Sequence, residues 1–159
     1  MSLSPVVLDT SNPYAWAIMP VVLERVKKFT AEHSDGVNDA LPQILAAGFG
    51  TKHPSILIIA ILQDDKANLD EALAGYIVAG EESYLGRKTG MIYQFEKRGG
   101  EDADWVELNK SLGAMVDLWA RSNGLDEIMA MAETDSRARL FHMFGYQRGP
   151  VLLRRKFNG

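Results

Sequence analysis

Seven consecutive apolar residues, Ile56 to Leu62, limit the folds open to this chain more than any other segment. An amphipathic helix or a half-exposed strand would place polar residues within such a run, so the run predicts a strand that is buried on both faces. A strand of this kind needs other elements packed on both sides of its sheet. The run is also much shorter than the roughly 20 residues of a membrane-spanning helix.

We expect further helices and strands before and after this strand in the sequence. Apolar residues at three- and four-residue steps predict four helices. The first follows Asn12, carries Trp16, Met19, Leu23, Val26 and Phe29 on its inner face, and has a kink or restart at Pro20. The others are Asp39–Ala47, a helix from Trp105 that stops at Asn123 and Gly124, and a last helix through Leu140–Phe144. Short apolar segments predict strands at Val6–Leu8, Leu73–Gly80, Met91–Glu96, Glu127–Ala132 and Val151–Phe157, with a polar connection at Asp64–Glu71, a turn at Gly86–Gly90 and a loop at Lys97–Asp104.

Length and composition narrow the class of protein. A chain of 159 residues favours one domain, here taken as residues 1–159. The 17 Lys and Arg residues against 21 Asp and Glu give a net charge of -4, which disfavours a strongly basic nucleic-acid binder. The lack of cysteine excludes disulfides, iron–sulfur clusters and thiol nucleophiles. The first residues resemble no signal peptide, so we expect a soluble, cytoplasmic protein without a membrane partner.

Common motifs for metal and phosphate chemistry do not fit the sequence. The three histidines, His33, His53 and His142, are not spaced as metal ligands, so no metal site is predicted. The segment Gly80–Thr89 has five residues between its glycines and an arginine before its lysine, which a phosphate-binding P-loop does not allow. Alternation along Arg154–Lys156 divides these charges between two faces, which favours a charged edge strand over a phosphate site.

Three segments carry a family resemblance: Leu73–Val78, Leu118–Ile128 and Arg137–Tyr146, the last of which ends in a glycine and an aromatic residue. Together they resemble the GNAT family of acyl-CoA N-acyltransferases. The first is similar to the third strand of that family, the second to the end of its central helix and the strand that follows, and the third to its final helix. The resemblance covers about two-thirds of the chain. It implies a single α/β domain with a mixed, mostly antiparallel sheet flanked by helices.

The resemblance also implies acetyl-CoA as the acyl donor and indicates where it would bind. In this family the donor lies where the strand before the central helix separates from its neighbour, and backbone N–H groups at the helix N-terminus hold the pyrophosphate. The corresponding contacts in this chain are Phe95, Lys97, Arg98, Gly99, Gly100 and Trp105.

The sequence departs from the pyrophosphate loop of the family, which is written Arg/Gln-x-x-Gly-x-Gly/Ala. Counting back from Gly124 without gaps places Asp104, Glu107 and Asn109 at the Arg/Gln and glycine positions. Four acidic residues lie between Glu101 and Glu107, where a pyrophosphate would bind. They would repel its charge, whereas they would stabilise the N-terminus of an ordinary helix through the helix dipole.

The candidate catalytic residues follow from the same resemblance. Many members protonate the leaving thiolate with a tyrosine in the last helix, and Phe141 occupies that position here. His142 is the next residue and points about 100° away around the helix, so it is either an acid or base or a surface or packing residue. Glu96 and Glu133 end two strands and are the candidate bases, acting through water.

Two functions therefore remain open at the level of sequence. The first is transfer of an acyl group, expected to be acetyl, from coenzyme A to an amine, with water replacing the missing tyrosine. The second is a GNAT-like domain without catalysis that serves as a binding or structural module in a larger assembly. The sequence leaves open the acceptor amine, any protein partner and whether the chain forms a homo-oligomer, and only dispersed basic residues speak for nucleic acid.

Overall fold

The computed structural model describes residues 3–9, 11–32, 40–50, 56–84, 86–130, 132, 135–149, 155 and 157. The elements in chain order are β1 (Leu3–Val7), α1 (Pro13–Glu32), α2 (Leu41–Gly50), β2 (Ile56–Gln63), α3 (Leu69–Ala72), β3 (Leu73–Tyr84), β4 (Arg87–Lys97), α4 (Asp102–Ser122), β5 (Glu127–Ala130) and α5 (Asp135–Met143). No helix in this described part of the chain is both long and apolar enough to cross a membrane.

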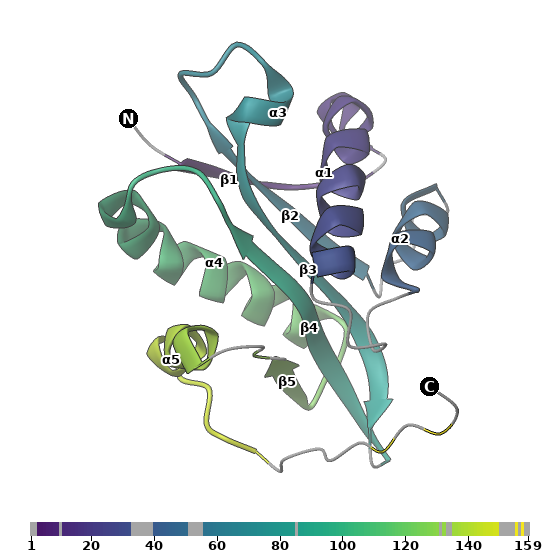
Figure 1. Ribbon diagram of the computed structural model, residues 1–159. Coiled ribbons are helices and arrows are strands. Elements are labelled where there is room, and N and C mark those ends of the chain that lie inside the picture. The colour runs from purple at the N-terminus through teal and green to yellow at the C-terminus, as the bar shows by residue number, and fades with distance from the viewer. Residues whose placement is uncertain are drawn as a thin grey trace.

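The five described strands form one sheet in the order β1-β2-β3-β4-β5. The first three pairings are antiparallel, and β4 and β5 are parallel. Helices α1 and α2 lie on one side of the sheet and α4 and α5 on the other (Figure 1). The predicted α/β fold with a mixed, mostly antiparallel sheet flanked by helices is therefore confirmed.

Strand β2 divides the core in two, as its apolar run predicts. Leu57, Ile59 and Ile61 pack in a cluster with residues of α4 and α5. Ile58 and Ala60 point the other way, into a cluster with residues of α1 and α2. Because both faces of the strand are covered, alternation between apolar and polar residues is absent from its sequence.

Helix α1 differs from its prediction in two respects. It does not restart at Pro20 but continues through it, and Pro20 lies on the exposed side, where water can satisfy the carbonyl that proline leaves without a donor. Trp16 is 56% exposed and its ring contacts Phe49 of α2 at 4.9 Å, so it does not lie on the inner face. The buried stripe of the helix consists of Ala15, Ile18, Met19, Val22, Arg25, Val26 and Phe29.

Several predicted boundaries were wrong because the strands and helices extend further along the chain than the sequence indicates. Residues Arg87 to Gly90 pair with the end of β3 instead of forming a turn, and the chain reverses at Gly86, whose φ is 76°. Helix α4 begins at Asp102, three residues before the predicted start, and the acidic residues of its first turn favour the positive end of the helix dipole. Helix α2 continues to Gly50.

The polar connection after β2 contains a further short helix, α3. The Asn68 side chain accepts a hydrogen bond from the Asp70 backbone N–H at 2.8 Å and so caps this helix. The predicted final strand Val151–Phe157 lies outside the described residues except for Arg155 and Phe157. Glu133, a predicted site residue, also lies outside them.

Candidate functional site

The second half of β4 forms an open edge of the sheet. Strand β5 pairs with β4 only from Thr89 to Ile92. In the part of the chain that the structure describes, residues 93–97 have no strand partner on that side, and they lead through a short loop to the N-terminus of α4. The candidate site is therefore the open edge of β4, defined as residues 93–97, together with the side chains around it.

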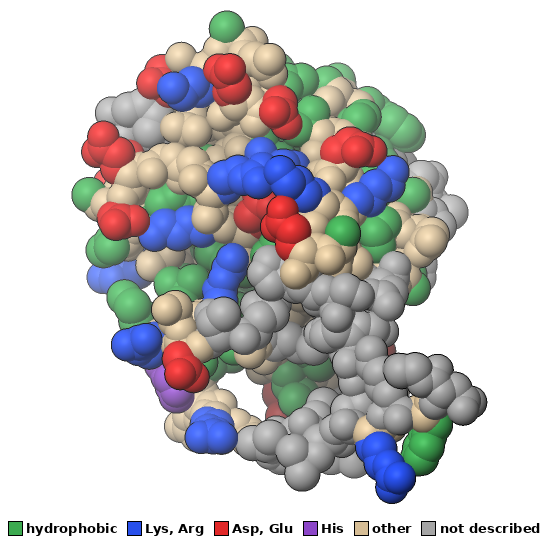
Figure 2. All heavy atoms as spheres, viewed as in Figure 1, with side chains coloured by type: hydrophobic (Ala, Val, Ile, Leu, Met, Phe, Trp, Pro, Cys, Tyr) green, Lys and Arg blue, Asp and Glu red, His purple; other side chains and the backbone are tan. Residues whose placement is uncertain are grey.

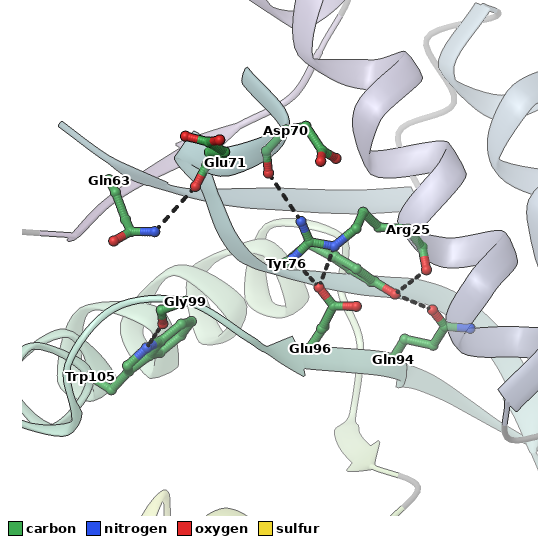
Figure 3. A network of polar contacts seen from close by, with 9 residues as sticks. All are labelled: Arg25, Gln63, Asp70, Glu71, Tyr76, Gln94, Glu96, Gly99 and Trp105. Atoms are coloured by element: carbon green, nitrogen blue, oxygen red, sulfur yellow. Dashed lines mark hydrogen bonds and ion pairs between the residues drawn. The ribbon is translucent and has the colours of Figure 1, made fainter. Parts of the chain in front are cut away.

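A buried ion pair lies against the α1 side of this edge. The Arg25 side chain, on α1, donates from Nε to Oε1 of Glu96 at 2.8 Å, and its Nη2 also donates to this oxygen. The Arg25 Nη1 donates to the backbone carbonyl of Asp70 at 3.4 Å. Figure 3 shows these contacts of Arg25 with Glu96 and Asp70. Arg25 is only 5% exposed and Glu96 only 9%. Each charge therefore depends on the other for stabilisation away from water.

A chain of neutral hydrogen bonds lies beside the ion pair and joins β3 and β4 to α1. The Tyr76 hydroxyl, on β3, donates to Oε1 of Gln94 at 2.8 Å. The Gln94 amide nitrogen donates to the Thr30 hydroxyl at 2.9 Å, and that hydroxyl donates to the Val26 carbonyl at 2.8 Å. Burial, and then the charge of Glu96, raise the pKa of Tyr76. The tyrosine is therefore held as a neutral hydrogen-bond donor.

Aromatic rings fill the opposite side of β4. The Phe95 ring lies 6.1 Å from the Trp105 ring and 6.4 Å from the Phe141 ring, and Phe141 lies 5.4 Å from Tyr146. Burial, followed by the charge of Asp117, raises the pKa of Tyr146 to about 12. Phe141, which stands at the position of the family's proton donor, is buried in this cluster as a core residue.

The loop after β4 is bound to the neighbouring strand. The backbone N–H groups of Arg98 and Gly99 both donate to the Ala74 carbonyl at 2.8 Å. The indole N–H of Trp105 donates to the Gly99 carbonyl at 2.7 Å. A Cβ on Gly99 would lie 2.6 Å from the Gln63 amide nitrogen. Close packing against β2 and β3 therefore explains Gly99, and two of the predicted pyrophosphate donors already have an acceptor.

Charge at the start of α4 is partly compensated within the loop. The Lys97 ammonium lies 2.9 Å from Oδ1 of Asp102 and 5.8 Å from the centre of the Trp105 ring. Asp104 is the second acidic residue of the first turn, and Glu101, at the N-cap, makes no side-chain hydrogen bond to the helix. The carboxylates of this turn would oppose the approach of a phosphate, while Lys97 reduces that opposition.

A further arginine reaches the open edge from α5. The guanidinium carbon of Arg137 lies 5.8 Å from the ring centre of Phe95 and 5.9 Å from that of Phe29. Phe95 belongs to β4 and Phe29 to α1. Arg137 is half-buried. Its charge therefore lies where α1, β4 and α5 meet.

The structure brings together most of the predicted site residues. Phe95, Lys97 and Gly99 each contact Trp105 at the end of β4, and Gly100 adopts a φ of 80° beside Leu3 and Trp105. Arg98 lies in the same loop with an exposed side chain. The other predicted residues lie apart from this group: Glu96 lies on the other face of β4, His142 is exposed in the last turn of α5, and Glu133 is not among the described residues. Their roles stay predictions.

Sequence reasoning missed Arg25, Gln94 and Arg137. Arg25 was detectable in principle, because it interrupts the otherwise apolar stripe of α1 between Val22 and Val26. Gln94 and Glu96 similarly place two polar residues two positions apart in a buried strand. Arg137 had no such signal, since an arginine near the start of a short helix is normally solvent-exposed.

A cavity of about 410 Å³ lies at the start of β5. It is lined by Asp117, Ala120, Arg121, Leu125, Asp126, Glu127, Ile128, Phe144, Gly145, Tyr146 and Gln147. None of these is a predicted site residue. Because β4 and β5 are parallel, this cavity lies at the start of β5 and away from the open edge. Among the described residues, no three His, Asp or Glu side chains are grouped as metal ligands would be.

Comparisons with known proteins bear on the fold. No family model and no curated protein sequence matches this chain. A probable acetyltransferase has a TM-score of 0.65 at 9% identity, covering 98% of this chain and 97% of that one. An aminoglycoside acetyltransferase from an uncultured soil metagenomic sample has a TM-score of 0.64 at 16% identity, with both chains covered completely. An acetyltransferase from Trypanosoma brucei has a TM-score of 0.62 at 15% identity, covering 98% of this chain and 100% of that one. The chain therefore has the fold of the GNAT acetyltransferases that its sequence resembles.

Proposed function

We propose that this chain is an acyl-CoA-dependent N-acyltransferase that transfers an acetyl group to an amine. The observation that carries the proposal is the open edge of β4, which ends at the N-terminus of α4 within a GNAT fold. In the family that the sequence resembles, the acyl donor binds at this position. The three similar structures reported above are named as acetyltransferases, which supports the same class of reaction.

The residues at this edge fit the acyl donor with one change from the sequence prediction. The backbone of β4 from Phe95 to Lys97 has no other described strand to pair with on this side, so it is suited to bind an extended chain of amides. Because the N–H groups of Arg98 and Gly99 are engaged by Ala74, we assign the phosphates to other groups. These are the first N–H groups of α4 and the exposed guanidinium of Arg98.

The reaction needs one base and one acid. The acceptor nitrogen attacks the thioester carbonyl carbon, a C–N bond forms and the C–S bond breaks; the nitrogen loses a proton and the thiolate gains one. Arg25 binds Oε1 of Glu96, and Oε2 makes no hydrogen bond within the described part of the chain, so Oε2 is the oxygen that would take the proton through water. Glu133 remains the other candidate base, and water protonates the thiolate since Phe141 has no proton to donate.

A second candidate function is a binding or structural module without catalysis. Three observations favour it. The loop amides are engaged by Ala74, and acidic residues occupy the first turn of α4. The burial of Phe141 among aromatic rings is also what a purely structural residue would show. This alternative predicts a stable fold that does not bind an acyl donor.

A titration of acetyl-CoA separates the two candidates. A ligand at a hundredfold above its dissociation constant adds about 2.7 kcal/mol to the stability of the folded state, which raises the melting temperature of a domain of this size by about 5–10 °C. We expect this rise in the native chain, a smaller rise in Arg98→Glu and an unchanged rise in Lys110→Glu. Lys110 is an exposed residue of α4 and provides the matched charge reversal. If millimolar acetyl-CoA does not raise the melting temperature, the function is instead that of a binding or structural module without catalysis.

A further inference from the structure

The ion pair of Arg25 and Glu96 differs in its surroundings from three other ion pairs of the described chain. It joins α1 to the open edge of β4, and both of its side chains are buried. The three others each have an exposed partner: Lys27 with Glu24, Arg87 with Glu127, and Lys97 with Asp102. An exposed pair stays in water, whereas a buried pair loses the hydration of both charges, which costs free energy.

The stability of the fold does not by itself explain this buried pair. Arg25 lies between Val22 and Val26 on the stripe of α1 that faces the core, where the neighbouring side chains are apolar. Apolar replacements of a buried ion pair are often as stable as the pair itself. Buried titratable groups that face a specific charge are common at functional sites. The pair is therefore better explained by the function of Glu96 at the open edge of β4.

The Arg25 guanidinium binds only one of the two oxygens of Glu96. Its Nε and Nη2 both donate to Oε1, and its Nη1 donates to the Asp70 backbone carbonyl at 3.4 Å. A guanidinium that met the carboxylate fork to fork would bind both oxygens instead. Because the guanidinium is planar and these three nitrogen atoms all have acceptors, its orientation is fixed. The carboxylate is held through Oε1, and Figure 3 shows the other oxygen pointing away from the guanidinium.

The surface around the pair favours the reactive form of an amine. Figure 2 shows basic side chains gathered in the middle of the face that it draws, between α3 and the end of β4, with acidic side chains around them. Positive charge nearby disfavours the protonated form of an amine, and only the neutral amine is a nucleophile. The proton that remains to be removed is then the one that the nitrogen loses on attack. The base therefore has to be in position when the C–N bond forms.

We propose that Arg25 is a positioning residue for the acyl transfer: it fixes the Glu96 carboxylate through Oε1, so that Oε2 takes the proton of the acceptor amine through water. This inference rests on the proposed acyl transfer. As the C–N bond forms and the C–S bond breaks, the nitrogen gives a proton to water, and water gives one to Oε2 and one to the thiolate. Arg25 keeps its protons, because a guanidinium does not lose them in proteins, and it acts only through Glu96.

The substitution Arg25→Lys tests the proposal. Lysine keeps the positive charge but has one nitrogen atom, so it cannot hold Oε1 with two donors and the Asp70 carbonyl with a third. The kcat and KM are measured by release of thiol from acetyl-CoA, with ethanolamine, putrescine or water alone as the acceptor. We expect kcat to fall about tenfold or more, since a displacement of about 1 Å can cost a hundredfold. The KM and the rise in melting temperature with acetyl-CoA should stay unchanged.

A double-mutant cycle separates positioning from a general loosening of the fold. If Arg25 acts through Glu96, Arg25→Lys should lower kcat in the native chain and have no further effect on kcat in Glu96→Gln. Val26→Ala is the matched control, because it removes two methyl groups from the buried stripe beside Arg25 and leaves both charges in place. It should leave kcat unchanged. If Arg25→Lys does not fold, Arg25→Gln, which keeps an N–H donor for Oε1, replaces it in the cycle.

The outcomes separate this inference from the proposed function. If acetyl-CoA does not raise the melting temperature, both are refuted. If Glu96→Gln or Arg25→Lys keeps the full kcat, or if the two losses multiply, the acyl transfer stands and the positioning role is refuted.

A measurement without turnover decides if acetyl-CoA binds but neither the amines nor water react at a measurable rate. It is the ¹³C NMR signal of the Glu96 carboxyl carbon, which is identified by its loss in Glu96→Gln. An unchanged signal in Arg25→Lys would overturn the proposal, because Arg25 would then not hold the carboxylate. A signal that is shifted or broadened in Arg25→Lys, but not in Val26→Ala, would support it.

Discussion

The substitution Glu96→Leu should strongly destabilise the fold because it isolates the charge of Arg25. Arg25 is 5% exposed, and its guanidinium directs two nitrogen atoms to one carboxylate oxygen. Removing one partner of such a pair leaves a buried charge without compensation, which costs about 3–5 kcal/mol. Since domains of this size are stable by roughly 5–15 kcal/mol, this is a large fraction of the total.

Equilibrium unfolding in urea measures the effect. With a denaturant slope of about 2 kcal/mol per molar, the midpoint for Glu96→Leu should fall by about 2 M. Glu96→Gln keeps an oxygen acceptor for Arg25 and should lower the stability by only about 1–3 kcal/mol. The double variant Arg25→Met/Glu96→Leu removes both charges and should recover most of the loss, since apolar replacements of buried ion pairs are often neutral.

Two results would refute this reasoning. One is a loss below about 1 kcal/mol for Glu96→Leu, which is the range of an exposed ion pair. The other is a double variant whose loss equals the sum of the two single losses, because additivity would mean that Arg25 and Glu96 do not stabilise each other. Either result would show that the pair is not held in a water-excluded environment.

The other predictions concern packing, alkaline pH and catalysis. Gly75→Ala should lower the free energy of unfolding by about 3 kcal/mol or more, because its Cβ would lie 2.1 Å from the Glu96 carbonyl oxygen and 2.8 Å from the Trp105 ring. A Cβ on Gly149 would meet open space, so Gly149→Ala is the control and should change the free energy of unfolding in urea by less than about 0.5 kcal/mol. Stability should fall as the pH rises from about 10 towards 12, because an unfolded tyrosine ionises near 10 while folded Tyr146 stays protonated to about 12; Tyr146→Phe should make this decline shallower, and an unchanged slope would contradict the assignment. Glu96→Gln should lower kcat/KM for acetylation by about a hundredfold or more while acetyl-CoA still raises the melting temperature, and full activity would transfer the role of base to another group.

The sheet could be predicted from sequence because its signals are local. The run Ile56–Leu62 predicts a doubly covered strand from adjacent residues alone, and the structure buries both of its faces. The segments that follow predict the antiparallel meander in the same way. The end of the β3–β4 hairpin was missed because its strands carry charged residues such as Arg87 and Lys88, which are usual in turns and equally suited to an exposed two-stranded extension.

The candidate site was only partly predictable because its contacts join distant residues. Glu96 was selected as the end of a strand, but its partner Arg25 lies 71 residues earlier in the chain. Gly99 suggested a backbone open to a ligand, yet Ala74 accepts its N–H and Gln63 fills the space beside it. Neither contact has a signature in the sequence around the glycine. A glycine allows close approach of some group to the backbone, and only the fold decides whether that group is a phosphate or the protein itself.

The most direct test of the proposed binding mode is to follow backbone amide NMR shifts while acetyl-CoA is added. The proposal predicts that the perturbed amides lie in residues 93–104, which comprise the open edge of β4, its loop and the first turn of α4. The cavity at the start of β5, lined in part by residues 125–128, provides the internal comparison and should remain unperturbed. Shifts that instead cluster around this cavity, or no shifts at millimolar acetyl-CoA, would contradict the claim that the open edge of β4 binds an acyl donor.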